Sequence, residues 1–135
     1  MTAQVAFLFP GQGSQAVGMG ADVYQTSTAA RQVFETVDEA LGISLSKICF
    51  EGPEDTLRET INAQPAIVTA SLALSAAFQE ALSPHSSTWS SPLVPSYTAG
   101  HSVGEYTALV AAGGLDLKSA ANAGPVRGVM VEPGE

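Results

Sequence analysis

The residues that most directly suggest chemistry are Gly100-His101-Ser102-Val103-Gly104, a G-x-S-x-G pattern. In such a pattern the serine stands on a sharp turn between a strand and a helix, and the glycines leave room for that turn. The first N–H groups of the following helix can then stabilise an oxyanion beside the serine hydroxyl. The pattern therefore favours Ser102 as the nucleophile of an acyl transfer reaction.

A nucleophilic serine needs a base, and the chain has two histidines. Neighbouring residues at a strand end point to opposite sides, so His101 is poorly placed to take the proton of Ser102. We interpret His101 as a residue that supports the turn, and His85, in a stretch rich in serine and proline, as a surface residue. The sequence offers no convincing base.

The elements that would position Ser102 can be recognised around it. Residues 96–99 predict a short strand and residues 103–112 an apolar helix, so strand, turn and helix follow in order. Residues 4–9 form a continuous apolar run, typical of a strand buried on both faces. The glycine-rich residues 11–20 predict a loop.

Two longer helices are predicted between these strands. One spans about residues 27–41 and stops at Gly42, and the other begins at Gln64-Pro65 after a turn at residues 52–55. The second is largely apolar, so we expect it to be deeply buried. Their apolar faces comprise Ala30, Phe34, Val37 and Leu41 in the first helix, and Ile67, Ala70, Leu74, Phe78 and Leu82 in the second. Strands that alternate with helices predict an α/β fold with a parallel sheet.

Composition narrows the functional classes. A length of 135 residues with 45% hydrophobic content suits one compact domain, and a net charge of -8 disfavours nucleic acid and anionic membranes as partners. Cys49 lies in an apolar stretch, so a buried structural thiol is expected. No basic residue precedes Arg31, which argues against a signal peptide, and we expect no apolar run long enough to cross a membrane. A cytoplasmic protein is the expectation.

Two longer motifs resemble a known family. Phe-Pro-Gly-Gln-Gly-Ser-Gln at residues 9–15 and Gly-His-Ser-Val-Gly-Glu-Tyr at residues 100–106 resemble malonyl-CoA:acyl-carrier-protein transacylases, as does Gln-Pro-Ala at residues 64–66. The similarity runs from about Val5 to about Leu117. We therefore interpret residues 1–135 as a partial acyltransferase domain with a divergent tail, residues 118–135.

This resemblance implies a ping-pong reaction of fatty acid biosynthesis. A serine takes malonyl from coenzyme A and passes it to the phosphopantetheine thiol of acyl carrier protein, with no bound cofactor. Ser102 matches the nucleophile, and Gln12 and Val103 match the residues whose main-chain N–H groups form the oxyanion hole. Arg127 matches the arginine that grips the malonyl carboxylate, for which a guanidinium fork is suited.

The resemblance also implies an incomplete fold. Family members are much longer, and the part without a counterpart here holds the catalytic histidine and a ferredoxin-like subdomain. What remains is an α/β-hydrolase-like parallel sheet flanked by helices, with a missing C-terminal half as a further candidate partner. Asn122, Gly124 and Pro125 disturb the helix that should lead to Arg127, so the register of Arg127 stays open.

Three other functions are compatible with parts of the sequence. A serine esterase would use the same elbow, although the loop at residues 11–15 and Arg127 suit an acyl carrier and a carboxylated acyl group. Residues 11–16 also match the dinucleotide pattern G-x-G-x-x-A, but Glu35 and Asp38 lie in a helical pattern rather than after a second strand. Without a base, the chain could instead be an inactive fragment that serves as a binding partner.

Overall fold

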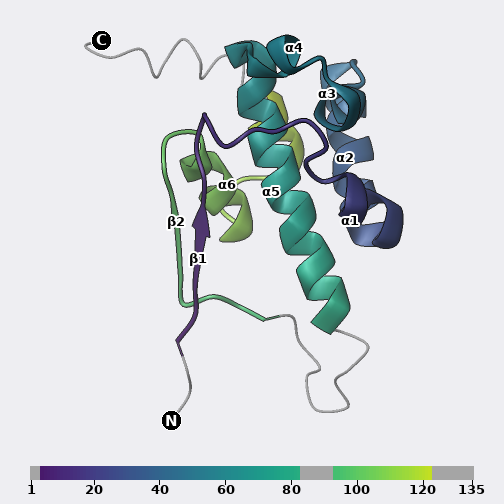
Figure 1. The fold of residues 1–135 in the computed structure, drawn as a ribbon. Helices are drawn as coiled ribbons and strands as arrows, with labels where there is room; N and C mark the ends of the chain where they lie inside the picture. The colour runs from purple at the N-terminus through teal and green to yellow at the C-terminus, as the bar shows by residue number, and fades with distance from the viewer. Residues whose placement is uncertain (1–3, 83–92, 123–135) are drawn as a thin grey trace, which may run out of the picture.

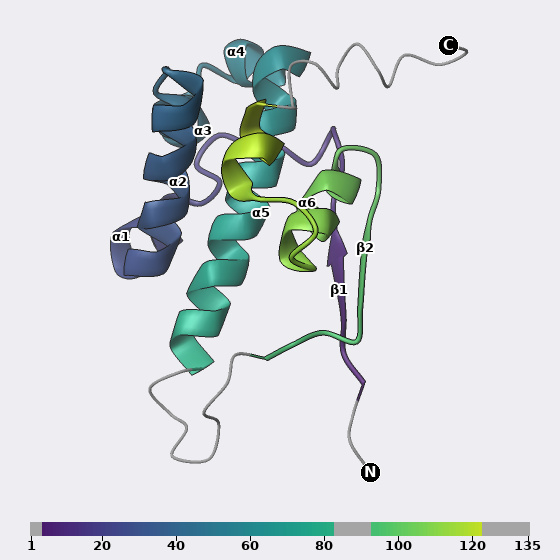
Figure 2. The same cartoon turned by 180° about the vertical axis from the view of Figure 1, so that it is seen from behind.

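The computed structural model describes residues 4–82 and 93–122. Two parallel strands lie beside a group of helices, as Figures 1 and 2 show from opposite sides. The elements are β1 (Ala6–Phe9), α1 (Ala21–Thr26), α2 (Thr28–Leu41), α3 (Leu45–Glu51), α4 (Glu54–Arg58), α5 (Thr60–Leu82), β2 (Tyr97–Gly100) and α6 (Gly104–Ala111). Residues 117–122 are also helical. The α/β class, with a parallel sheet flanked by helices, is confirmed.

The two strands bury only one face of their small sheet. Alternate side chains of β1 and β2 are exposed and half-buried, and helix α6 packs against both strands. The exposed set is Ala6, Leu8, Tyr97 and Ala99. With Leu8 76% exposed, the prediction that residues 4–9 are buried on both faces is wrong for this chain, because no described element covers the second face.

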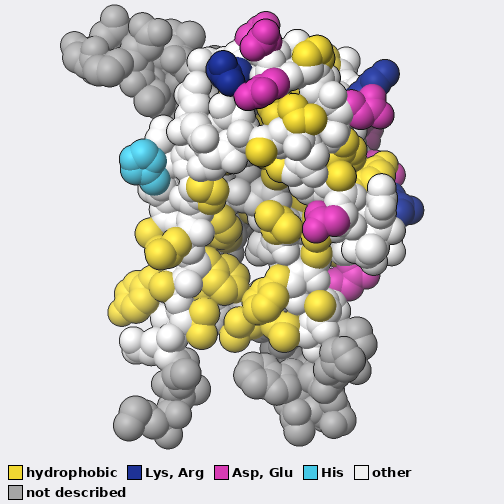
Figure 3. Space-filling view, in the orientation of Figure 1, with side chains coloured by type: hydrophobic (Ala, Val, Ile, Leu, Met, Phe, Trp, Pro, Cys, Tyr) yellow, Lys and Arg dark blue, Asp and Glu magenta, His cyan; other side chains and the backbone are white. Residues whose placement is uncertain are grey.

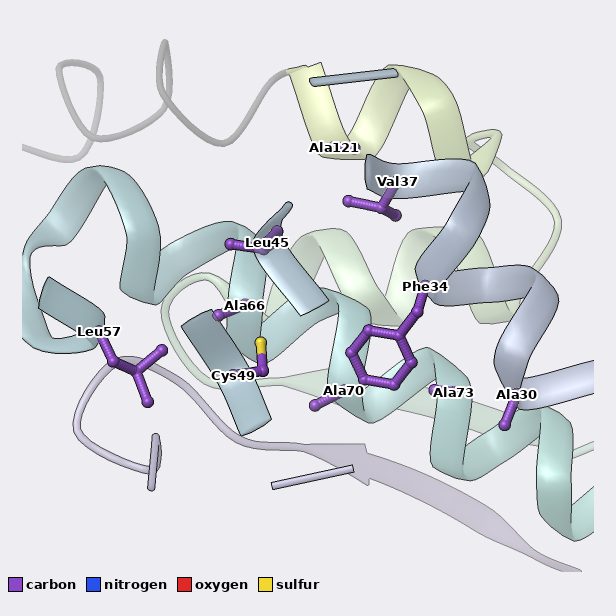
Figure 4. Close-up of a cluster of buried hydrophobic side chains, with 10 residues drawn as sticks. All are labelled: Ala30, Phe34, Val37, Leu45, Cys49, Leu57, Ala66, Ala70, Ala73 and Ala121. Carbon is purple, nitrogen blue, oxygen red and sulfur yellow. The ribbon is translucent and has the colours of Figure 1, made fainter. Parts of the chain in front are cut away.

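Helix α2 forms where the sequence predicts it. Ser27 caps its first turn by accepting a hydrogen bond from the Ala30 N–H, and Gly42 ends it at a positive φ of 67°. Its apolar face packs into the main core, shown in Figure 4. The buried members of that core are Ala30, Phe34, Val37, Leu45, Cys49, Leu57, Ala66, Ala70, Ala73 and Ala121.

Cys49 lies inside this core, as the sequence predicts for a structural thiol. Its side chain is fully buried. Burial, followed by the nearby charge of Asp38, raises the pKa of the Cys49 thiol to about 12. The thiol therefore stays protonated and unreactive at neutral pH.

Helix α5 differs from its prediction in two respects. It begins at Thr60, four residues before Gln64, and carries Pro65 inside the helix. It is largely buried from Ala63 through Ala73, but Leu74, Phe78 and Leu82 are 49%, 47% and 37% exposed. The expectation of deep burial therefore holds only for residues 63–73.

The length of α5 also corrects the expectation about membrane spans. Its 23 residues have a mean hydropathy of 1.3 in the most apolar window, enough by length and composition to cross a membrane. The small and polar residues within it obscure this in the sequence. Since 56% of that window is buried inside the described chain, α5 has the arrangement of a core helix.

Glu80 joins α5 to the start of α2 and should make stability depend on pH. Its carboxylate accepts hydrogen bonds from the Ser27 hydroxyl and the Ala29 N–H, and these lower the pKa of Glu80 below 4.5. A lowered folded-state pKa stabilises the fold at neutral pH, and this is lost as the pH falls through that pKa. We expect Glu80→Gln to flatten the decline in unfolding midpoint below about pH 4.5, measured by urea denaturation at several pH values. An identical decline in both proteins would contradict this role.

Candidate active site

The G-x-S-x-G segment forms a sharp elbow between β2, which ends at Gly100, and α6, which begins at Gly104. Ser102 stands in this turn with a φ of 56°, the one positive φ of a non-glycine residue in the described part of the chain. The left-handed region costs an L-residue about 1–2 kcal/mol, and such strain is concentrated at functional sites. Ser102 itself is half-buried.

The flanking glycines are required by close approach of the backbone. A Cβ on Gly100 would lie 1.9 Å from the Gly104 carbonyl oxygen, and one on Gly104 would lie 2.5 Å from the Phe9 carbonyl oxygen. Real Cβ atoms do not come so near a main-chain oxygen. The role assigned to these glycines in the sequence therefore agrees with the geometry.

The loop after β1 lies directly against the elbow. A Cβ on Gly11 would be 2.4 Å from the His101 carbonyl oxygen and 2.8 Å from the Ser102 Cβ. Because β1 and β2 are parallel, their carboxyl ends meet at the same edge of the sheet, where ligands of α/β proteins bind. The structure thus brings the Gln12 loop and Ser102 together, as the sequence interpretation requires.

The main-chain N–H groups of Gln12 and Val103 are available at this edge. Neither donates a hydrogen bond to any residue within 4–82 or 93–122. Val103 is 1% exposed, so its N–H lies where competing water is scarce. An oxyanion hole needs free N–H donors beside the nucleophile, so this observation is compatible with the roles of Gln12 and Val103, which stay predictions.

His101 closes the turn through its main chain. Its N–H donates to the Phe9 carbonyl at 3.1 Å, and its carbonyl accepts from the Gly104 N–H at 2.9 Å. The side chain is exposed. These bonds belong to the backbone, so the supporting role of the imidazole stays a prediction.

Two sequence predictions fall outside the described residues. Arg127 is one, so its contact with a malonyl carboxylate and its register stay predictions. His85 is the other.

Within the described residues, no three His, Cys, Asp or Glu side chains gather in a way that could hold a metal ion.

Gln64 and Thr60 are site residues that sequence reasoning did not assign. The Gln12 Nε2 donates to the Thr60 hydroxyl at 3.1 Å, and the Gln64 Nε2 donates to the Gln12 Oε1 at a long 3.5 Å. The first turns of α5 therefore hold the side chain of Gln12. In the sequence, the only indication for Gln64 is that a polar glutamine stands in an apolar run. Nothing in the sequence indicates a role for Thr60.

Gln64 also carries an unpaired group. The side chain is 2% exposed, and its Oε1 has no hydrogen-bond partner among the described residues. An unpaired buried amide oxygen costs about 1–3 kcal/mol, so glutamine is a poor choice here for stability alone. Departures from a stable core are expected near functional sites.

Gln64→Leu should therefore preserve stability. Leucine is similar in volume and has no polar group to leave unpaired, so we expect the free energy of unfolding to stay the same or to rise by up to about 1 kcal/mol. Urea denaturation measures this directly. A loss of more than about 2 kcal/mol would mean that the Gln64 amide is held by strong bonds.

The strand, the strained serine and the helix after it define the class of α/β proteins with a serine elbow at the carboxyl edge of a parallel sheet. A family model described as "Acyl transferase domain" matches residues 6–134. The chain belongs to this acyl transferase family.

Individual relatives narrow the resemblance. The chain is 48% identical over 117 residues to malonyl CoA-acyl carrier protein transacylase of Bacillus subtilis (strain 168), covering 87% of this chain and 34% of the relative. A crystal structure of acyl-carrier-protein-S-malonyltransferase from Bartonella henselae matches with a TM-score of 0.83 and 44% identity, over 94% of this chain and 38% of that one. A malonyl-transacylase in complex with a type II polyketide synthase acyl-carrier protein matches with a TM-score of 0.82 and 38% identity, over 95% of this chain and 38% of that one.

The chain therefore spans between a third and two-fifths of the length of these relatives. Within that span it has the fold of the solved malonyltransferases, which confirms the partial fold expected from the sequence.

Proposed function

We propose that this chain is the nucleophile-bearing part of a malonyl-CoA:acyl-carrier-protein S-malonyltransferase. The observation that supports it best is the elbow, in which Ser102 at a φ of 56° abuts Gly11 of the Gln12 loop. The similarity to malonyl CoA-acyl carrier protein transacylases supplies the substrate class. The proposed location is the cytoplasm, and the proposed pathway is fatty acid biosynthesis.

The proposed chemistry has two balanced steps. The Ser102 hydroxyl attacks the malonyl thioester carbonyl, the C–S bond breaks, and coenzyme A leaves as a thiol while malonyl forms an ester on the serine. The phosphopantetheine thiol of acyl carrier protein then attacks this ester and restores the hydroxyl. In each step the N–H groups of Gln12 and Val103 face the developing oxyanion, and Arg127 binds the malonyl carboxylate.

The proton of Ser102 needs an acceptor, and we propose that none is supplied within residues 4–82 and 93–122. His101 makes no hydrogen bond to Ser102 in the described structure. On the resemblance to the family, we propose that the catalytic histidine belongs to the part of the domain that has no counterpart in this chain. We therefore expect the 135-residue chain alone to acylate slowly, because oxyanion stabilisation acts without a general base.

Intact-protein mass spectrometry after incubation with malonyl-CoA tests the proposal. We expect slow, incomplete labelling of the chain and none of Ser102→Ala. Rapid stoichiometric labelling would show that a base lies within the chain. Hydrolysis of acetyl esters without malonyl transfer to acyl carrier protein would favour a serine esterase, and absence of any labelling would favour an inactive partner chain.

A further inference from the structure

The peptide between Gly11 and Gln12 carries the Gln12 N–H, and the elbow holds it at one end. Gly11 is buried, and a Cβ there would lie 2.4 Å from the His101 carbonyl oxygen and 2.8 Å from the Ser102 Cβ. The elbow therefore packs directly against Gly11. The next residue, Gln12, is exposed, so it needs a further contact if its N–H is to keep one direction.

The rest of the loop uses its N–H groups internally. The Gly13 N–H donates to the Gln15 Oε1 at 2.8 Å, and the Ser14 N–H donates to the Gly11 carbonyl at 3.3 Å. Of the three consecutive N–H groups that begin with Gln12, only that of Gln12 donates to no residue in the described part of the chain. The direction of this free donor depends on how Gln12 is held.

The Gln12 side chain reaches the first turn of α5. Its Nε2 donates to the Thr60 hydroxyl at 3.1 Å, whereas its Oε1 accepts from the Gln64 Nε2 at 3.5 Å, beyond the usual length of an N–H···O bond. The contact with Thr60 is therefore the stronger of the two. The turn that carries Thr60 is itself fixed, because the Ala63 N–H donates to the Glu59 carbonyl at 2.7 Å.

The hydrogen bond between Gln12 and Thr60 lies in a solvated part of the surface. Both residues are exposed, and Figure 3 shows acidic and basic side chains around the end of the molecule where α4 and the start of α5 lie. A hydrogen bond that water can replace adds little to the free energy of folding. It does fix a direction, because it ties the long Gln12 side chain to a helix.

We propose that Thr60 is a positioning residue, which holds Gln12 so that its main-chain N–H faces the oxyanion formed at Ser102. The peptide that carries this N–H is then fixed at both ends, since the elbow holds Gly11 and α5 holds Gln12. Preorganised donors stabilise a developing charge because they need no reorientation during the reaction. The role toward the oxyanion rests on the proposed malonyl transfer, whereas the hold of Thr60 on Gln12 does not.

Thr60→Val tests this role, because valine keeps the shape of threonine and lacks the hydroxyl. We expect NMR relaxation to show the Gln12 amide of the unmodified chain as rigid as the amides of α5, and Thr60→Val to make it more mobile. The rate of Ser102 labelling at saturating malonyl-CoA should fall about three- to tenfold, the worth of one hydrogen bond. The malonyl-CoA concentration at half-maximal rate should stay the same, because the contact acts only in the transition state. Thr60→Ser should restore both the rigidity and the rate.

Thr28→Val is the matched control. Thr28 is also exposed and is the first residue of its helix, α2, as Thr60 is of α5. We expect this variant to leave the Gln12 amide and the labelling rate unchanged. Urea denaturation should give similar unfolding midpoints for Thr28→Val and Thr60→Val, which separates positioning from a general loss of stability.

Several results would overturn the proposal. These are a Gln12 amide that is equally mobile with and without the Thr60 hydroxyl, failure of Thr60→Ser to restore rigidity, and equal effects of Thr28→Val and Thr60→Val. Unchanged labelling of Thr60→Val, in a chain that accepts malonyl, would also overturn it. If the chain never accepts malonyl but the Gln12 amide loosens in Thr60→Val and recovers in Thr60→Ser, the hold of Thr60 on Gln12 is supported and the proposed function is removed.

Discussion

Replacing Phe34 with alanine is expected to lower the free energy of unfolding by about 3–5 kcal/mol. Phe34 is fully buried on α2, and its ring centroid lies 5.8 Å from that of Tyr24 and 4.9 Å from that of Phe50. Gly20 approaches the same ring so closely that a Cβ there would be 2.6 Å from it. Removing the ring would leave a cavity where α1, α2 and α3 meet, and rigid neighbours cannot fill it.

Phe78→Ala is the matched control, because the same atoms are removed from a half-exposed position. We expect this variant to lose about 1 kcal/mol in the isolated chain, in proportion to the smaller area that Phe78 buries. Urea denaturation followed by circular dichroism gives both values. Equal losses for the two variants would show that Phe34 is not the centre of the core.

The long helices were predictable where the residues that determine their start, end and buried face lie within the helical segment itself. In α2, the apolar spacing, Ser27 and Gly42 specify the buried face, the start and the end within the segment itself. The predicted start of α5 was wrong because proline is normally favoured in the first turn of a helix, where its missing N–H costs nothing. Here the helix begins five residues earlier, at Thr60, and accommodates the proline.

Helices α1 and α3 were not predicted because their causes are distant in the sequence. Each has fewer than eight residues, too few for an apolar period to be evident. The start of α3 is held by the Asp38 carboxylate, which accepts from the N–H and hydroxyl of Ser46. The packing of Tyr24 and Phe50 on Phe34 stabilises both helices and depends on the tertiary fold.

In the candidate site, too, local features were predictable and contacts between distant residues were not. Ser102 and its glycines were predictable, because the turn imposes its requirements on adjacent residues. The hydrogen bonds from Gln12 to Thr60 and from Gln64 to Gln12 join residues that are 48 and 52 positions apart, so no local sequence pattern predicts them.

The error at residues 4–9 has a different cause. An apolar run such as Val-Ala-Phe-Leu-Phe is typical of a strand whose two faces are both covered by other elements. In the described part of this chain, only one face of the strand is covered. The sequence of β1 therefore matches the environment of a larger sheet. The structure shows the same mismatch, because the apolar side chains of Ala6 and Leu8 are exposed.

Gly100→Ala is expected to cost about 3 kcal/mol or more and to abolish labelling of Ser102. The added methyl group would lie 1.9 Å from the Gly104 carbonyl oxygen and 2.4 Å from the Glu105 nitrogen. All of these neighbours are backbone atoms of the elbow, so no change of side-chain rotamer can relieve the overlap. Relief requires β2 and α6 to move apart, which would displace the N–H of Val103 from the hydroxyl of Ser102.

The control for this variant is Gly114→Ala, where the nearest atom would be an ordinary 3.6 Å away. We expect it to change stability by less than about 0.5 kcal/mol and to leave labelling intact. Ser102→Gly separates strain from catalysis, because glycine removes both the hydroxyl and the cost of the left-handed conformation, and so should be about 1 kcal/mol more stable than Ser102→Ala. If Gly100→Ala retained both stability and labelling, the tight elbow would not be what positions Ser102.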